Sequence, residues 1–388
     1  MSFPELDIDL FTDDALQNFQ TLAGDIRAKG PVVSLTAHDV VALSRYADVR
    51  AALRSDNILV SGQGVGLNDF MNGMRSRTTL ISDGELHRQR RSTLIKPMMP
   101  RTLADVRPTL EAMSSELVTD LVSCDSFDGI TDFAQFLPVT VVSHLVGLPE
   151  AGRERMLEWS AATFNALGPA NRRHEEALAG LAEMGAYAAE LERDSLAPDG
   201  WAAQLFVAAE RGDIDSRDVR GLLIDYIAPS LDTTLLGAGW LLYLFSRYPD
   251  QFDLVKQNPD LIPSAVHEVL RFESPVRAFT RVAVADYNEG DVAIPANTRV
   301  LILYGAANRD ERQYDNPDVF DVTRNARDHM AFGQGQHRCA GAHLAQYELE
   351  ALLLALVNQV RRIECDEPEM LMSNMLHGLR KMPTTLVS

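Results

Sequence analysis

One short loop constrains this chain more than any other part of its sequence. Residues 332–341 read Phe-Gly-Gln-Gly-Gln-His-Arg-Cys-Ala-Gly, and an apolar helix is expected to begin directly after them. Gly333 and Gly335 permit backbone angles and close approaches that a β-carbon would forbid. The amides that open the helix can donate hydrogen bonds to a sulfur anion, and the helix dipole favours its charge. The loop therefore presents the Cys339 thiolate at the start of a helix.

The composition bounds the fold and the compartment. The chain has 388 residues, of which 46% are hydrophobic, and no Pro/Gly/Ser linker, low-complexity tract or repeat divides it. Residues 1–388 are therefore expected to form one domain with a core large enough to enclose a cofactor. Cys124, Cys339 and Cys365 are too few and too scattered for a disulfide framework or a zinc site, which suggests a reducing cytoplasm.

Charge and hydropathy exclude several partners. The net charge of −19 argues against nucleic acid and anionic membranes, because both reward clustered basic residues. The first ten residues carry acid where a signal peptide would carry base. The longest uncharged helical stretch, Thr233 to Ser246, is shorter than the roughly 20 residues that cross a bilayer. No export and no membrane association are expected.

The hydrophobic pattern predicts a mainly α fold with small β-sheet regions. Strands are expected only in Pro31 to Leu43, as a hairpin, and in Val276 to Ile302. Amphipathic helical stretches are expected at Pro100 to Val122, Phe133 to Leu148, Gly152 to Leu167, Arg173 to Asp194, Ser216 to Arg247 and Ala340 to Val360.

Two helical motifs place charged residues on one face. Glu268 and Arg271 are three residues apart and can pair. His87 and Arg91, in the stretch that begins Asp83-Gly84-Glu85, lie one helical turn apart and face the same way. Each motif alone is common on protein surfaces.

A third motif lies inside the long apolar helix expected from about Ser216 to Arg247. There, Pro229 and Ser230 precede Asp232 and Thr233. An acid and a hydroxyl in a buried helix are costly unless both find partners, which favours a functional interpretation.

The loop and these motifs, in this order along the whole sequence, resemble the cytochrome P-450 family. The resemblance implies the fold of that family, with a haem between the long central helix and the cysteine loop. It implies that Cys339 is the iron ligand. By the same resemblance the cofactor contacts are His87, Arg91, Arg281, Phe332, Gly333, His337, Cys339 and Gly341. His87, Arg91, Arg281 and His337 are implied to bind the haem propionates.

The resemblance also assigns roles away from the iron ligand. Glu268, Arg271 and Arg324 are implied to form a buried structural network. Asp232 and Thr233 are implied to be the acid and alcohol that relay protons to bound dioxygen. The family usually has small residues where this chain has Pro229 and Ser230, so the proline is expected to distort the helix by another route.

The implied activity is a haem b monooxygenase that inserts one atom of O₂ into a small organic substrate. No flavin or iron–sulfur motif is visible in the sequence, so electrons are expected from NAD(P)H through a ferredoxin and its reductase. The candidate docking patch consists of exposed basic residues, namely Arg88, Arg90, Lys96 and Arg338. A cytoplasmic monomer is implied.

The substrate pocket is expected to be an apolar slot with a few polar groups, suited to a small aromatic that is hydroxylated or O-demethylated. The candidate substrate-binding residues are Leu67, Phe70, Phe164, Asn165, Ser230, Phe279 and Leu376. Hydroxylation of a terpenoid or another secondary metabolite is one alternative. A peroxide-driven haem-thiolate enzyme and a non-enzymatic haem gas sensor are two others.

Overall fold

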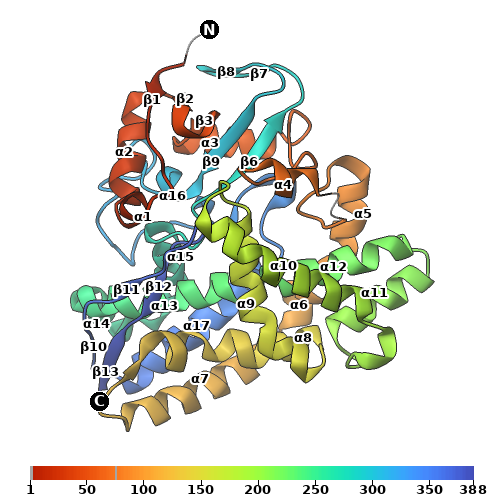
Figure 1. The fold of residues 1–388 in the computed structure, drawn as a ribbon. Coiled ribbons are helices and arrows are strands. Elements are labelled where there is room, and N and C mark those ends of the chain that lie inside the picture. Colours follow the sequence, from red (N-terminus) through yellow and green to blue (C-terminus); the bar gives the residue numbers. More distant parts are fainter. Residues whose placement is uncertain (1–2, 75–76) are drawn as a thin grey trace.

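The computed structural model describes residues 3–74 and 77–388 and is mainly helical. Most helices gather in one part of the molecule, and the largest sheet lies beside the N-terminal helices (Figure 1). The helices are α1 (Asp13–Gln17), α2 (Phe19–Lys29), α3 (Tyr46–Arg54), α4 (Asp69–Gly73), α5 (Gly84–Leu94), α6 (Pro100–Leu103), α7 (Arg107–Val122), α8 (Ser143–Val146), α9 (Glu150–Ala166), α10 (Arg172–Glu190), α11 (Trp201–Glu210), α12 (Val219–Ile227), α13 (Asp232–Arg247), α14 (Pro249–Gln257), α15 (Ile262–Phe272), α16 (Tyr304–Ala307) and α17 (Ala342–Gln359).

The largest sheet has six strands in the order β1-β2-β3-β9-β6-β4. Its strands are β1 (Glu5–Leu6), β2 (Val33–Leu35), β3 (Val40–Leu43), β4 (Leu59–Val60), β6 (Ala278–Ala283) and β9 (Arg299–Leu303). The parallel pairing of β3 with β9 sets Val41 opposite Val300 and joins the two strand regions expected from the sequence. Both regions are therefore confirmed, and they form one sheet.

Strands also occur outside those two regions, so their expected confinement was wrong. β7 (Tyr287–Glu289) and β8 (Val292–Ile294) lie within the second expected region and form a two-stranded sheet of their own. The strands outside the expected regions are β1, β4, β5 (Phe127–Asp128), β10 (Arg362–Cys365), β11 (Glu369–Met370), β12 (Leu379–Lys381) and β13 (Pro383–Val387). Most of the unexpected strands lie near the C-terminus, where β10 pairs with β13. These strands are short and their partners are distant in sequence, so the local pattern of residues carries little signal.

The central helix expected from Ser216 to Arg247 is two helices. α12 ends at Ile227 and α13 begins at Asp232, with residues 228–231 outside any helix. Pro229 lies in this interval; it has no backbone N–H to donate, and its ring clashes with the preceding turn. The helical ladder resumes where the Leu235 N–H donates to the Leu231 carbonyl at 3.0 Å. The expected distortion is thus a complete break.

Two other expected helices are also interrupted. The stretch 100–122 divides into α6 and α7, and 133–148 consists of two π-helical turns followed by α8. Within the described residues, Gly129–Val146 is the one helical segment with the length and composition of a membrane span, and 56% of it is buried inside the fold. Core helices meet the same criteria, so this is weak evidence for a span.

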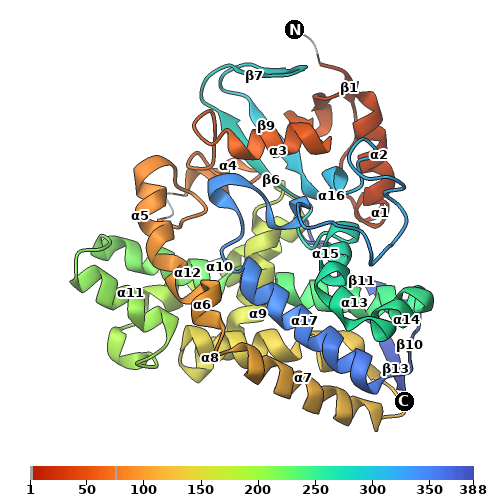
Figure 2. The ribbon, with the colours of Figure 1, turned by 180° about the vertical axis from the view of Figure 1, so that it is seen from behind.

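α13 occupies the centre of the helical part. Eleven of its 16 residues are buried, and it packs against α9, α15 and α17. Figure 2 shows α17 lying alongside α7 near this centre. A β-carbon on Gly239 would lie 2.9 Å from Cδ1 of Ile130, so the glycine allows the π-helical segment to approach α13 closely. α17, which follows the cysteine loop, thus becomes part of the core.

Candidate active site

A cavity of about 560 Å³ lies where the break between α12 and α13 faces the loop that carries Cys339. This volume is within the range of roughly 300–1,000 Å³ that is typical of small-molecule sites. The wall is mostly apolar. Apart from tyrosines, the titratable side chains that the described residues contribute to it are Arg91, Asp225, Arg281, His337, Cys339 and Glu348.

The cysteine loop has the predicted form. The Cys339 N–H donates to the Phe332 carbonyl at 2.8 Å, which closes the loop, and α17 begins three residues after the cysteine. Burial raises the pKa of the Cys339 thiol, whereas a hydrogen bond from the Gly341 backbone N–H and the charge of Arg91 lower it. The thiol borders the cavity together with Phe332, Gly333 and Gly341, and the Gly341 N–H and the Arg91 charge partly offset the effect of burial on its pKa.

Two of the three glycines in the loop, Gly333 and Gly335, have different roles. Gly333 and Gly335 have φ angles of +62° and +70°, which disfavour any residue with a β-carbon. A β-carbon on Gly335 would also lie 2.3 Å from the Leu53 carbonyl oxygen, whereas one on Gly333 would meet its nearest atom at 4.0 Å. Gly335 therefore also allows the loop to pack tightly against α3.

Gly335→Ala is expected to destabilise the folded protein more than Gly333→Ala. Both variants incur about 1–3 kcal/mol for a strained backbone, since Gly333 with ψ −171° lies in a region that is essentially restricted to glycine, and only Gly335→Ala adds the collision with Leu53. Urea unfolding and haem content after purification measure the difference. Equal urea midpoints for the two variants would show that the contact with α3 rearranges without a loss of folding free energy.

The cavity edge carries three of the four residues that the resemblance assigns to the haem propionates. Arg91, Arg281 and His337 all lie on the wall. The Arg281 guanidinium donates to the Thr280 carbonyl at 2.8 Å, and the Arg91 guanidinium donates to the Arg338 carbonyl. Burial and the charge of Arg281 lower the pKa of His337 to about 2, so its imidazole is neutral at physiological pH and keeps one N–H to donate.

His87 lies one layer behind this edge. It does not line the cavity, but its ring is 4.2 Å from the His337 ring, centroid to centroid. Among the described residues, neither of its buried ring nitrogens has a hydrogen-bond partner. Buried nitrogens without partners are costly, and a haem carboxylate near Arg91 and His337 would satisfy such donors. The residues present therefore fit a haem.

Asp232 and Thr233 do not face the cavity together. Thr233 lies on the wall, and its hydroxyl donates to the Pro229 carbonyl at 3.2 Å. Asp232 is absent from the wall. Burial raises the pKa of its carboxyl to about 7, an effect that the hydroxyl of Ser160 opposes. The acid can therefore exchange a proton near neutral pH, from a position behind the hydroxyl.

Four of the seven predicted substrate-binding residues line the cavity. Phe70, Phe164, Ser230 and Phe279 are on the wall, and the rings of Phe164 and Phe279 are nearly parallel with their centroids 6.4 Å apart. The Ser230 hydroxyl donates to the Tyr226 carbonyl, so this hydroxyl is already hydrogen-bonded within the helix break. The wall is thus mainly aromatic and aliphatic.

The other three lie outside the cavity wall, which corrects their expected position. The Leu67 side chain packs on the main core, and Leu376 is buried within that core. Asn165 instead braces the C-terminal region, because its side-chain oxygen accepts from the Asn374 N–H at 3.0 Å. Their segments approach the cavity, but their side chains point into packing or into hydrogen bonds.

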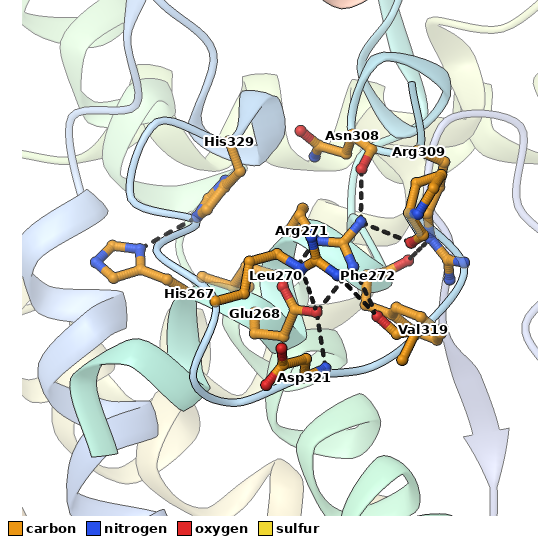
Figure 3. A network of polar contacts seen from close by, with 12 residues as sticks. His267, Glu268, Leu270, Arg271, Phe272, Asn308, Arg309, Val319, Asp321 and His329 are labelled. Atoms are coloured by element: carbon orange, nitrogen blue, oxygen red, sulfur yellow. Dashed lines mark hydrogen bonds and ion pairs between the residues drawn. The ribbon is translucent and has the colours of Figure 1, made fainter. Parts of the chain in front are cut away.

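The predicted network of Glu268, Arg271 and Arg324 is present, and Figure 3 shows Glu268 and Arg271 at its centre. The Arg271 guanidinium makes two hydrogen bonds to the Glu268 carboxylate, at 2.7 and 2.8 Å, and both side chains are fully buried. Arg324 reaches the same carboxylate at 3.3 Å, and the Asp321 N–H donates to it at 3.0 Å. Every buried charge in the pair is therefore matched.

This network connects to the cysteine loop through Asn308. Arg271 donates to the Asn308 carbonyl at 2.8 Å, and the Asn308 side-chain oxygen accepts from the Met330 N–H at 2.6 Å. Met330 begins the turn that contains Phe332. The ion pair thus holds the backbone from which the loop starts.

Sequence reasoning missed two acids on the wall, Asp225 and Glu348. Burial raises the pKa of Asp225 to about 7 and that of Glu348 to about 8. Both Glu348 oxygens are buried, and within the described part of the chain neither has a hydrogen-bond partner. Each acid interrupts an apolar helical face, and this interruption was the feature of the sequence that could have identified it.

One residue of the expected basic patch is not exposed. Arg90 is buried and pairs with Asp218 at 2.8 Å, because it lies on the face of α5 that packs inward. Arg88 and Lys96 are on the surface, where they pair with Glu85 and Asp213.

Comparison with known proteins identifies the class of this fold and site. A family model described as Cytochrome P450 matches residues 160–386. Cytochrome p450 CYP199A2 of Rhodopseudomonas palustris is 34% identical over 389 residues, covering 99% of this chain and 94% of that protein. The 6-deoxyerythronolide B hydroxylase of Saccharopolyspora erythraea is 28% identical, and the alignment covers 99% of this chain and 98% of that protein.

Solved structures agree with these relatives. Mycobacterium marinum cytochrome P450 CYP268A2, in complex with pseudoionone, superimposes with a TM-score of 0.88 at 26% identity, covering 99% of each protein. CYP109E1 from Bacillus megaterium, in complex with testosterone, gives a TM-score of 0.86 at 23% identity, covering 97% of this chain and 99% of its own, and supports the fold alone.

The chain belongs to the cytochrome P450 family. It is therefore a haem-containing monooxygenase, an oxidoreductase that receives electrons from a redox partner and acts on an organic substrate.

Proposed function

We propose that this enzyme hydroxylates or O-demethylates a small aromatic compound, using O₂ and electrons that a ferredoxin and its reductase deliver from NAD(P)H. The observation that carries this proposal is the shape of one cavity. It brings the Cys339 thiol, the Thr233 hydroxyl and the parallel rings of Phe164 and Phe279 onto a common wall. Aromatic walls of this size suit a compact ring better than a long acyl chain.

In this proposal the protein holds haem b through Cys339. Arg91, Arg281 and His337 bind its propionates, and His87 supports His337 from behind. Phe332, Gly333 and Gly341 contact the macrocycle. When bound, the haem supplies the iron at which dioxygen is activated, and a thiolate ligand favours O–O cleavage.

The remaining chemistry belongs to the side chains of the wall. The Gly341 N–H and the Arg91 charge stabilise the anionic form of the Cys339 sulfur and so oppose the effect of burial. Thr233 holds a proton at its hydroxyl on the cavity side, and Asp232 replaces that proton from behind, because its pKa lies near 7. The apolar walls exclude bulk water and orient the substrate ring.

We also propose that the enzyme acts as a single-domain monomer in the cytoplasm. None of the three cysteines forms a disulfide, in keeping with a reducing compartment.

Thr233→Ala is expected to uncouple electron consumption from oxygenation. Without the hydroxyl, proton delivery loses its last donor, and general acid–base catalysis of this kind contributes on the order of 10²–10⁴-fold. Product per NAD(P)H should fall at least about tenfold while hydrogen peroxide accumulates, and Thr233→Ser should recover coupling. Unchanged coupling in Thr233→Ala would remove Thr233 from the relay.

The reaction class and the substrate class are tested separately. Turnover with NAD(P)H, ferredoxin and reductase supports the proposal; turnover only with peroxide would support a peroxide-driven enzyme, and no turnover a gas sensor. Among ligands, small aromatics should shift the spin state of the ferric haem. A shift with fatty acids or macrocycles, and none with aromatics, would contradict the substrate class alone.

A further inference from the structure

Among the residues that the structure describes, no cation pairs with Asp225, an acid on the cavity wall. It belongs to α12, one turn before the helix break, and lines the cavity beside residues 78–81. The backbone N–H of Thr79 donates to its Oδ2 at 2.6 Å. Within the described residues, no Lys, Arg or His nitrogen lies within 4.0 Å of this carboxylate. The nearby ion pairs are made by Asp218 instead.

The cations nearest to Asp225 are engaged elsewhere. Arg90 pairs with Asp218 at 2.8 Å and also donates to the Thr78 carbonyl at 3.3 Å. Arg91 donates to the Arg338 carbonyl. Their charges and the Thr79 hydrogen bonds only partly offset burial, which raises the pKa of the Asp225 carboxyl to about 7. An ionised carboxylate has about four lone-pair sites, so Asp225 can accept a further hydrogen bond from the cavity side.

The rest of the cavity wall is largely apolar and includes Leu80, Leu178, Leu181 and Ile224. The Thr79 hydroxyl also hydrogen-bonds to Asp225, whereas the Ser230 hydroxyl donates to the Tyr226 carbonyl and the Thr233 hydroxyl to the Pro229 carbonyl. Asp225 is thus an acid on a mostly apolar wall, an arrangement typical of a specificity contact in a ligand pocket.

We propose that Asp225 accepts a hydrogen bond from the substrate, so that the enzyme prefers a small aromatic whose ring carries a donor group, above all a cationic one. This inference rests on the proposed function and specifies its substrate class. A charged donor forms a shorter and stronger hydrogen bond to a carboxylate than a neutral one does. An anionic substituent would instead meet a like charge in a low-dielectric site.

The test uses three methoxybenzenes of similar shape with different para substituents. They are 4-methoxybenzamidine, a cationic donor; 1-methoxy-4-isopropylbenzene, which is neutral and apolar; and 4-methoxybenzoate, an anion. Each is titrated into the ferric holoenzyme, and the spin-state shift gives its dissociation constant. The amidine should bind at least about tenfold more tightly than the isopropyl compound, and the benzoate should bind most weakly.

Asp225→Asn provides the matched variant. It should bind the amidine no more tightly than the isopropyl compound, whose own affinity should not change. Equal binding of these two compounds by the natural enzyme, or an amidine preference that survives in Asp225→Asn, would overturn the inference and leave the aromatic class standing. If none of the three compounds shifts the spin state of a holoenzyme with a normal reduced carbon monoxide spectrum, the proposed function fails as well. Should the variant not retain haem, the natural enzyme's ranking decides alone.

Discussion

Cys339→Ser and Cys339→His are expected to abolish oxygenation, even in preparations that retain haem. The loop presents one sulfur to the cavity, and no other sulfur of the loop can replace it, because Phe332 to Gly341 contain a single cysteine. Without a thiolate ligand, the iron loses the electron donation that favours O–O cleavage. Product formation should fall below detection, and the reduced carbon monoxide complex should lose the red-shifted Soret band of a haem thiolate.

Cys124→Ser is the matched control, because Cys124 is an exposed thiol far along the sequence from the loop. It should keep both the spectrum and the turnover of the natural enzyme. An unaltered reduced carbon monoxide spectrum in either Cys339 variant would show that another residue ligates the iron.

Glu268→Gln is expected to cost about 3–5 kcal/mol of folding free energy, because it leaves the fully buried Arg271 without its counter-ion. A loss of this size is a large share of the roughly 5–15 kcal/mol that stabilises a typical domain. The cysteine loop should suffer with it, since Asn308 connects Arg271 to Met330. Urea unfolding and haem content after purification measure the two effects.

The control for this variant is a helical pair on the surface. Arg172 and Glu176 lie 3.0 Å apart with their side chains 78% and 60% exposed. Arg172→Gln should change the stability by no more than about 0.5 kcal/mol. If Glu268→Gln matched this control in urea midpoint and haem content, the buried network would have no structural role.

The sequence was most informative where a motif acts within a few residues. Glu268 and Arg271 share a helix face because they are three residues apart, and the structure pairs them as predicted. Gly333 and Gly335 adopt positive φ angles, as a tight loop before a helix requires. Such features depend on local geometry, which spacing alone determines.

It was harder to predict from the sequence which side chains face the cavity. Successive residues of an α-helix point about 100° apart, since a turn contains about 3.6 residues. Thr233 and Asp232 therefore point in different directions, and of the two Thr233 alone lines the cavity, although their adjacency suggested a joint site. For Leu67, Asn165 and Leu376, orientation depends on distant partners such as Asn374, and no local pattern reports those.

The buried acids show a different limit. Asp225 and Glu348 each interrupt an apolar helical face, but the sequence does not say against what that face lies. Only the fold reveals that both lie on a cavity wall, because their burial depends on which side of α12 and α17 is covered.

The break at residues 228–231 separates two properties that a continuous helix would couple. α12 carries Asp225 and α13 carries Thr233. Our proposals assign ligand selection to Asp225 and proton delivery to Thr233. A hydrogen-bonded ladder would transmit a small rotation of one part to the other, whereas the interval around Pro229 gives each helix its own packing. Selectivity can then diverge by substitutions on α12 while the backbone beneath Thr233 stays in place, so the proline makes the two halves of the site independently evolvable.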